Sequence, residues 1–206
     1  MYIQYGCGLD APSTWLNFDA SPTLFLQKIP LLGFIFHTFS KTKFQKYVQF
    51  GDIIRGLTIE KNTCQAIYCS HVLEHLSLTD FRKAISNTYS YLTTGGTFRL
   101  VVPDLECLVK HYLSSINPEA CNHFMESSFL GKKDRSRHLL SFLREWLGNS
   151  HHLWMWDYKG IEKELKLVGF QNIRRALYGD STDPKFQEVE VEERWKDGVG
   201  IECIKR

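Results

Sequence analysis

Two groups of histidines give this sequence its clearest capacity for acid–base chemistry. His71, Glu74 and His75 lie together in "SHVLEHL", and His151 and His152 are adjacent further along the chain. Histidine changes its charge near neutral pH, so it can accept a proton from a reacting hydroxyl. We rank His75 and His151 highest as candidates for a general base, with His71 as a third candidate.

The same residues also have structural interpretations. Glu74 and His75 could orient the backbone at a helix start, and the two later histidines could form a lid hinge or a surface pair. A metal site that joins these histidines to Asp104 and Asp157 is less favoured, because no regular ligand spacing supports it. We therefore predict no metal.

A glycine pair near the N-terminus could place bare backbone against a ligand. Gly6 and Gly8 follow a β-rich run at residues 2–5, and glycine allows a sharp turn and a close approach. With Ala11 the string fits G-x-G-x-x-A, the dinucleotide fingerprint, which needs a helix directly afterwards and an acidic residue about 20 positions on. The residues after Ala11 leave little room for a helix, and Asp19 comes too early. A nicotinamide or flavin enzyme is thus a secondary hypothesis.

The elements that must position these residues alternate along the chain. Short β-rich runs predict strands at residues 2–5, 15–19, 64–70, 98–103, 173–178 and 199–206. Ser77 and Asp80 form a plausible capping box for a helix that ends at Gly95, and a second helix ends at Gly169. This order predicts an α/β, Rossmann-like, doubly wound and mostly parallel sheet with a C-terminal antiparallel hairpin. Ligands then bind beyond the carboxyl ends of the strands.

Two segments depart from this alternation. Residues 105–150 are helical and amphipathic, most clearly in "HLLSFLREWLG", and we expect a helical insertion that covers a site within a single domain of residues 1–206. The apolar segment Leu24–Phe36 contains a lysine, a proline and a glycine, and it is shorter than the about 20 apolar residues of a membrane span. It is either a buried or lid segment or a surface for peripheral membrane contact.

The net charge of the chain gives no reason to expect binding to nucleic acid. The 25 Lys and Arg residues nearly balance 23 Asp and Glu residues, which leaves a formal charge of +2. The six cysteines show no C-x-x-C pair and no secretory leader precedes them, so we expect reduced thiols and a cytoplasmic protein. A run of acidic residues is expected to form a solvated strand face: Glu188, Glu190, Glu192 and Glu193.

Five motifs occur in an order that points to a known family. They read "QYGCG", "WLNFD", "FGD", "AIYCSHVLEHL" and "LTTGGTFRLVVPDLE". In order and spacing they resemble the class I S-adenosylmethionine-dependent methyltransferases, in particular a bacterial branch that reads like "LNLGCG...GWINVD...SHVLEHL...GGxxRIVVPDL". The likeness covers nearly the whole chain.

The resemblance implies roles for individual residues. Gly6 and Gly8 would pass beneath the methionyl part of the cofactor, with Cys7 between them also counted as cofactor-binding, and Gln4 would face the cofactor's ammonium group. Asp19 would accept hydrogen bonds from the ribose hydroxyls, Asp52 would lie near the adenine, and Ser70 with His71 would border the transferred methyl group. Two features depart from the family pattern, because Gln4 stands where an acidic residue is common and the helix after the glycines is nearly absent.

The function that this resemblance implies is S-adenosylmethionine-dependent O-methylation of a small-molecule or sugar-type acceptor. The basic residues Lys132, Lys133, Arg135 and Arg137 are either solvated or suited to a phosphate-bearing acceptor. Two alternatives stay open: a non-catalytic protein of the same fold that binds a ligand or a partner, and the nicotinamide-dependent oxidoreductase.

Overall fold

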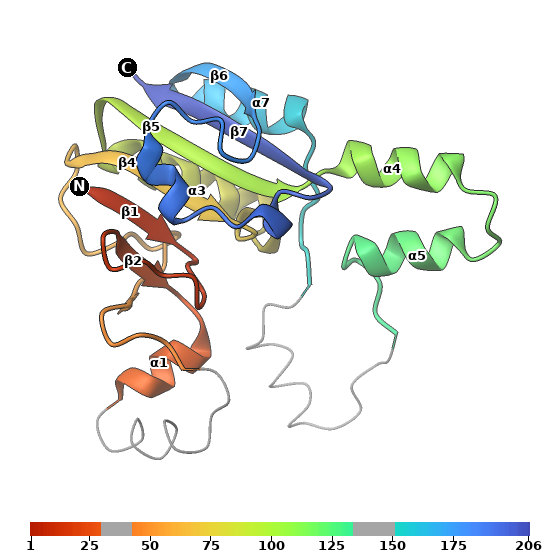
Figure 1. Ribbon diagram of the computed structural model, residues 1–206, viewed down its shortest axis with the longest axis horizontal. Coiled ribbons are helices and arrows are strands. Elements are labelled where there is room, and N and C mark those ends of the chain that lie inside the picture. Colours follow the sequence, from red (N-terminus) through yellow and green to blue (C-terminus); the bar gives the residue numbers. More distant parts are fainter. Residues whose placement is uncertain (30–42, 134–150) are drawn as a thin grey trace.

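The computed structural model describes residues 1–29, 43–133 and 151–206 (Figure 1). Its strands are β1 (Tyr2–Tyr5), β2 (Leu16–Asp19), β3 (Gln49–Phe50), β4 (Cys64–Ser70), β5 (Leu92–Pro103), β6 (Phe170–Ala176) and β7 (Gly198–Lys205). Its α-helices are α1 (Pro22–Lys28), α3 (Leu78–Tyr91), α4 (Leu105–Ser114), α5 (Ala120–Ser127) and α7 (Tyr158–Val168). Three short 3-10 helices complete the described elements: η1 (Leu73–His75), η2 (Pro184–Glu188) and η3 (Glu192–Arg194).

The strands form one sheet of seven in the order β3-β2-β1-β4-β5-β7-β6. Strands β1 to β5 pair in parallel, whereas β7 runs antiparallel to both β5 and β6. The predicted parallel sheet with a C-terminal antiparallel hairpin is therefore confirmed. Because β1 to β5 are parallel, their carboxyl ends meet at one edge of the sheet.

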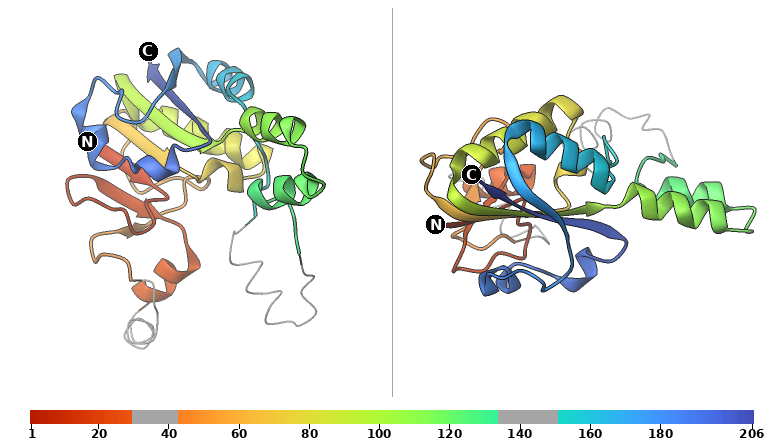
Figure 2. Two further views of the ribbon diagram at one scale, coloured as in Figure 1. Left: turned by 45° about the vertical axis from the view of Figure 1, so that its right-hand side comes forward. Right: turned by 90° about the horizontal axis from the view of Figure 1, so that it is seen from above.

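Alternate residues of β4 face opposite layers. Ile67 and Cys69 belong to the main core with α3 and α7, while Ala66 and Tyr68 pack with Phe186 of η2. All four β4 side chains are fully buried. Among the described residues, α3 and α7 thus cover one face of the sheet, and η2 and η3 lie against the other (Figure 2).

Helix α3 begins as the sequence predicts. Ser77 Oγ accepts a hydrogen bond from the backbone N–H of Asp80 at 3.2 Å, which satisfies one free donor of the first turn. The buried side of the helix follows the helical repeat, through Phe81, Ala84, Ile85 and Thr88. This helix lies directly after the histidine motif and fixes the position of η1.

The end of α3 and the start of β5 differ from the sequence prediction. The helix stops at Tyr91, and the strand begins at Leu92 rather than at residue 98. Leu92 pairs with Cys64, and the register then shifts across the glycines, where Gly95 has a φ of +80°. The glycines therefore form a bulge inside the strand rather than a helix stop before it.

Helices α4 and α5 form an arm that projects from the sheet (Figure 1). They contact each other through Tyr112 and Phe124, whose ring centroids are 5.8 Å apart, and neither helix contains a buried residue. This arm confirms the described part of the predicted insertion. Three predicted features lie outside the described residues: the helix at residues 138–148, the basic residues Arg135 and Arg137, and the apolar residues 30–36. Of the basic residues that are described, Lys133 pairs with Glu126.

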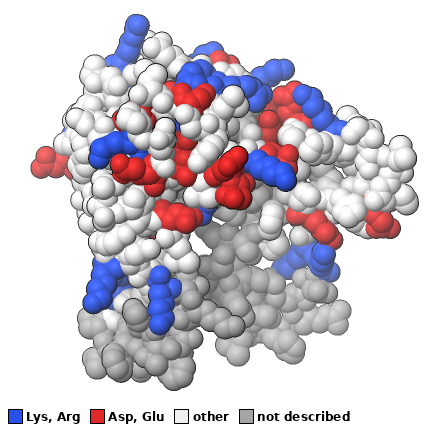
Figure 3. Space-filling view, viewed as in Figure 1, with Lys and Arg blue, Asp and Glu red and all other residues white. Residues whose placement is uncertain are grey.

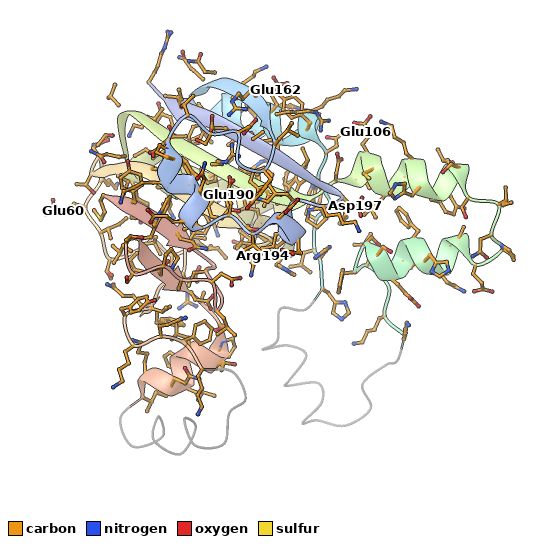
Figure 4. All side chains as sticks on the ribbon, in the orientation of Figure 1. Glu60, Glu106, Glu162, Glu190, Arg194 and Asp197 are labelled. Atoms are coloured by element: carbon orange, nitrogen blue, oxygen red, sulfur yellow. The ribbon has the colours of Figure 1, made fainter. Side chains whose placement is uncertain are left out.

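The predicted solvated acidic strand face is wrong for the strand and for Glu190, whereas Glu188, Glu192 and Glu193 are exposed as predicted. Residues 184–194 form η2 and η3 rather than a strand, and Glu190 is buried against the guanidinium of Arg99. Arg99 also lies 3.0 Å from carboxylate oxygens of Asp180 and Glu202. A fully buried arginine needs such partners, because an unpaired buried charge is costly. In Figure 4 Glu190 is labelled over the middle of the sheet.

The described surface carries charges of both signs. Figure 3 shows acidic and basic side chains interspersed over the described part of one face. Cys7, Cys64, Cys69 and Cys203 are buried, as expected for core thiols, while Cys107 is partly exposed and Cys121 is exposed. Within the described residues, no helix is both long enough and apolar enough to cross a membrane.

Candidate active site

A cleft of about 340 Å³ opens at the carboxyl ends of β1, β2 and β4. We call it the glycine cleft, and its lining includes Gly6, Asp19, Asp52, His71 and His75. In a parallel sheet this edge is where ligands bind. The cleft therefore lies where the sequence predicts a ligand.

Gly6 forms the tight turn at the end of β1. Its φ is +64°, a left-handed conformation that glycine adopts without steric cost. A Cβ at this position would lie 2.1 Å from Cγ2 of Val72, which also lines the cleft. Both the backbone angle and the packing against Val72 therefore require glycine.

Asp19 connects the glycine turn to the segment after β2. Its Oδ2 accepts the backbone N–H of Gly8 at 3.0 Å, and its Oδ1 accepts that of Ser21 at 2.8 Å. A carboxylate oxygen can accept more than one hydrogen bond, so both oxygens keep capacity for a ligand. Asp19 is thus a buried carboxylate that is fixed in place at the wall of the cleft and can bind a vicinal diol.

Asp52 lies on a second wall of the glycine cleft, just after β3. Its Oδ1 accepts the backbone N–H of Ile54 at 2.8 Å, and Arg55 Nε is 3.5 Å from Oδ2. The structure therefore brings Asp52 and Asp19 to one cleft from two neighbouring strands.

The other expected cofactor residues lie outside the lining of this cleft. Gln4 and Ser70 are buried, and Gln4 Oε1 and Ser70 Oγ have no hydrogen-bond partner among the described residues. The Cys7 side chain packs in a small core with Leu24, and burial raises the pKa of its thiol to about 12. Gly8 turns with a φ of +56° and gives its N–H to Asp19.

A second cleft of about 380 Å³ adjoins the first, and we call it the histidine cleft. Its polar lining comprises His71, Glu74, His75, Ser127, His152, Lys196 and Asp197. His71 and His75 line both clefts. These two histidines therefore form the boundary across which groups bound in the two clefts would meet.

His71 is held by acceptors on both ring nitrogens. Its Nε2 lies 2.7 Å from the carbonyl oxygen of Arg194, and its Nδ1 lies 3.2 Å from Oε1 of Glu74 in an ion-pair contact. Burial lowers the pKa of His71, but the contact with Glu74 and the Arg194 carbonyl outweigh burial and raise it. This ring is therefore better suited to hold its protons than to accept one.

His75 has the opposite arrangement. Its Nδ1 lies 3.1 Å from the carbonyl oxygen of His151, and a carbonyl only accepts, so Nδ1 carries the proton and Nε2 is left as an acceptor. The His151 ring lies outside both clefts, and its Nδ1 is 3.4 Å from the carbonyl oxygen of Phe129. His151 thus contributes its backbone, rather than its side chain, to the site.

His152 is the histidine that the sequence-based ranking misses. The N–H groups of Leu153 and Trp154 both donate to the Glu74 carbonyl oxygen, at 2.8 and 3.1 Å, so this segment is fixed beside η1. The His152 ring is buried and its centroid lies 4.9 Å from that of His75. Burial lowers the pKa of His152. The histidine doublet signals this residue, but the sequence does not show which ring faces inward.

The remaining candidates have other places. Asp104 and Asp157 cap α4 and α7, where they accept N–H bonds from Glu106 at 2.9 Å and from Gly160 at 2.7 Å. Lys196 and Asp197 belong to the loop between η3 and β7, and no pattern in the sequence links them to the histidines. Figure 4 shows Asp197 near the start of α4.

Comparisons with known proteins identify the family of the chain and its fold. A family model described as a methyltransferase domain matches residues 8–175. A SAM-dependent methyltransferase from Archaeoglobus fulgidus is 14% identical with a TM-score of 0.52, over 99% of this chain and 85% of its own. One from Thermotoga maritima is 12% identical with a TM-score of 0.52, over 100% and 82% of the two chains.

A third solved structure is phosphoethanolamine N-methyltransferase 2 of Haemonchus contortus in complex with S-adenosyl-L-methionine. It is 16% identical with a TM-score of 0.50, and the match covers 99% of this chain but 48% of the other. No curated protein matches the sequence. Identities this low show a shared fold alone, whereas the family model covers most of the chain. The chain belongs to the methyltransferase domain family.

Proposed function

We propose that this protein transfers a methyl group from S-adenosylmethionine to a hydroxyl of a small-molecule or sugar-type acceptor. The observation that carries the proposal is the shared boundary of the two clefts, which His71 and His75 line from both sides. A donor in one cleft and an acceptor in the other would meet there. Transfer of a methyl group depends mainly on such placement.

The glycine cleft has the features that this cofactor needs. Asp19 offers carboxylate acceptors to a ribose diol, Asp52 stands on the wall where we place the adenine, and Gly6 keeps the backbone bare. The sulfonium, when bound, supplies an activated methyl group. We also propose contacts from Gln4, Cys7, Gly8 and Ser70, on the strength of the family resemblance.

The histidine cleft is suited to a polar acceptor. Lys196 can donate hydrogen bonds to the hydroxyls of the acceptor, and Asp197 can accept hydrogen bonds from them. Protonated His71 balances the charge of Glu74. His75 is the side chain that we assign to activating the reacting hydroxyl, because its Nε2 acceptor lies at the boundary. His151 supports it through the backbone carbonyl that fixes the ring.

The nicotinamide alternative lacks a structural basis in the described residues. Residues 9–14 form turns and irregular backbone, with no helix after the glycines to bind a pyrophosphate. A non-catalytic binding protein of this fold could use the same two clefts. Transfer of a labelled methyl group distinguishes it from an enzyme.

Calorimetric titration with S-adenosylhomocysteine tests the donor site. We expect micromolar binding that Asp19→Ala weakens about tenfold, or about 1.4 kcal/mol. Glu60→Ala is the matched control, because Glu60 lines neither cleft and is labelled on the other side of the molecule from Asp197 (Figure 4). NADH is the negative control ligand. Absence of binding by folded wild-type protein, or equal binding of NADH, would overturn the proposed cofactor.

Incubation with labelled S-adenosylmethionine and a panel of hydroxyl-bearing sugars, nucleotide sugars and small metabolites tests the acceptor. Label in an oxygen-linked methyl group, lost in His75→Ala while S-adenosylhomocysteine binding persists, supports the proposal. Label only in nitrogen or carbon acceptors contradicts O-methylation. Cofactor binding without transfer to any acceptor favours the non-catalytic alternative.

A further inference from the structure

Glu74 is a buried carboxylate with unfilled bonding capacity. The residue is 1% exposed, and neither side-chain oxygen makes an aligned hydrogen bond to any described residue. Its ion-pair contact with His71 leaves most of its acceptor positions open. His71 supplies one positive partner, and the acceptor positions that remain open on this buried carboxylate can bind a metal ion.

Two further histidine nitrogens surround the same oxygen. His75 Nε2 lies 3.9 Å and His152 Nε2 lies 4.0 Å from Glu74 Oε1. The three side chains can each offer one ligand atom, and these atoms lie within 4.8 Å of one another. Ligand atoms of a four-coordinate zinc ion with bonds near 2.1 Å are roughly 3.4 Å apart, so small side-chain rotations close the site.

We infer that Glu74, His75 and His152 form a binding site for a divalent transition-metal ion. Two imidazoles and one carboxylate are a ligand set that such ions use, with a remaining position for an exogenous oxygen. All three residues line the histidine cleft, so that position faces the acceptor. The inference deepens the proposed function and rests on it for the identity of that oxygen, the acceptor's hydroxyl.

The surroundings of the ligands support a built site. His75 Nδ1 donates to the His151 carbonyl at 3.1 Å, and a metal-bound histidine typically gives its other N–H to such an oxygen. Leu153 and Trp154 fix the His152 segment to the Glu74 carbonyl. With the ion bound, His75 Nε2 would be a ligand and not a proton acceptor; the ion would then lower the pKa of the bound hydroxyl, and the proton would pass to solvent.

The spacing rules behind the prediction of no metal could not detect this arrangement. Glu74 and His75 are neighbours in the sequence, but the third ligand comes from a distant segment that backbone hydrogen bonds bring to η1. The described residues offer one other candidate cluster, formed by Cys107, His111 and Asp197. It is partly or fully exposed, and any test must separate it from the buried cluster.

Equilibrium dialysis of the whole protein against zinc chloride, with the bound metal then quantified, tests the inference. We expect one zinc per chain, with an affinity that His152→Ala and Glu74→Gln each lower by more than about tenfold. His111→Ala is the matched control and should bind zinc as the wild type does. Loss in His111→Ala with retention in both ligand variants would overturn the inference, as would no binding by the wild type.

Three further measurements keep the test decisive if a variant does not fold. Circular dichroism and S-adenosylhomocysteine titration report folding and the donor site without involving the metal, so a failed cofactor proposal is distinguishable from a failed metal proposal. X-ray absorption at the zinc edge needs only wild-type protein. Nitrogen and oxygen neighbours support the Glu74 site, whereas a sulfur neighbour would overturn it, because none of its three ligands contains sulfur.

Discussion

Arg99 of β5 is a buried, positively charged side chain that pairs with three carboxylates, those of Asp180, Glu190 and Glu202. The side chain is 0% exposed, its guanidinium carbon lies 4.6 Å from the ring centroid of Trp195, and Glu190 and Glu202 accept its hydrogen bonds. Replacing one partner of a buried pair leaves the other charged and unpaired. The residue therefore ties β5 to the segment that covers the second face of the sheet.

We predict that Arg99→Met lowers the free energy of unfolding by about 3–5 kcal/mol, because Glu190 then keeps only the Gly179 N–H and is a buried charge with no cation beside it. Urea denaturation monitored by tryptophan fluorescence measures the change. The double variant Arg99→Met/Glu190→Gln should recover part of the loss, since it removes the orphaned charge. A double variant as unstable as the sum of its two single variants would contradict this explanation.

Gly6 and Gly95 both have a positive φ, so alanine substitutions at the two positions can distinguish backbone strain from steric overlap. A Cβ added at Gly95 would meet no described atom within 4 Å, whereas at Gly6 it would lie 2.1 Å from Val72. We predict that Gly95→Ala costs about 1–2 kcal/mol, the penalty of the left-handed backbone alone. Gly6→Ala should cost more and should also weaken S-adenosylhomocysteine binding, which Gly95→Ala should leave unchanged. Equal costs in thermal denaturation would argue against the packing role of Val72.

At the scale of elements, Asp157 belongs to a helix rather than to the chemistry. Its carboxylate caps α7 by accepting the Gly160 N–H at 2.7 Å. We predict that Asp157→Ala destabilises the protein by about 1 kcal/mol. Methyl transfer per folded molecule should be unchanged at a temperature where the variant is folded. Asp157→Asn, which keeps a capping oxygen, should restore most of the stability, and lost activity in folded Asp157→Asn would contradict the assignment.

Helices α3 and α7 are joined by a pH-sensitive ion pair. Arg82 Nε and Nη2 both donate to Glu164 at 2.8 Å, and this bonding lowers the pKa of Glu164 from its ordinary 4.5. Since the folded pKa is below the unfolded one, the pair stabilises the protein above about pH 4.5 and loses its effect as the pH falls through the folded pKa.

The melting temperatures of wild type and Glu164→Gln test this pair. We expect the wild type to melt at a higher temperature at pH 7 and the difference to shrink progressively below about pH 4.5. Glu162→Gln is the control, because that residue lies on the same helix and pairs with Lys166 on an exposed side. A difference that is constant with pH would show that charge at Glu164 is not the cause.

The elements differ in how far the sequence alone determines them. Local signals place α3 and α7, because Ser77, Asp157 and Gly169 are caps whose partners lie within a few residues. The start of β5 could not be predicted, since Gly95 permits both a helix stop and a bulge, and pairing with β4 decides between them. Glu190 could not be assigned either, because its buried partner Arg99 is 91 positions away.

At the scale of the whole molecule, the candidate site is an assembly of distant segments. The turn at Gly6 and the carboxylate of Asp19 could be predicted, because glycine and strand-end positions carry local meaning. The approach of His152 to Glu74 could not, because two backbone bonds across the fold establish it. Arg194 likewise meets His71 only through the folded chain, at a separation of 123 residues.

The position of β7 has a consequence for the order in which this protein can be built. Strand β6 is synthesised before β7, yet within the described sheet its neighbour is β7, which also covers the free edge of the long strand β5. While the ribosome has not yet released residues 198–205, β5 exposes an unpaired edge and Arg99 lacks Glu202. Nascent chains stalled just before Gly198 therefore present an open strand edge, the feature that invites aggregation and chaperone binding.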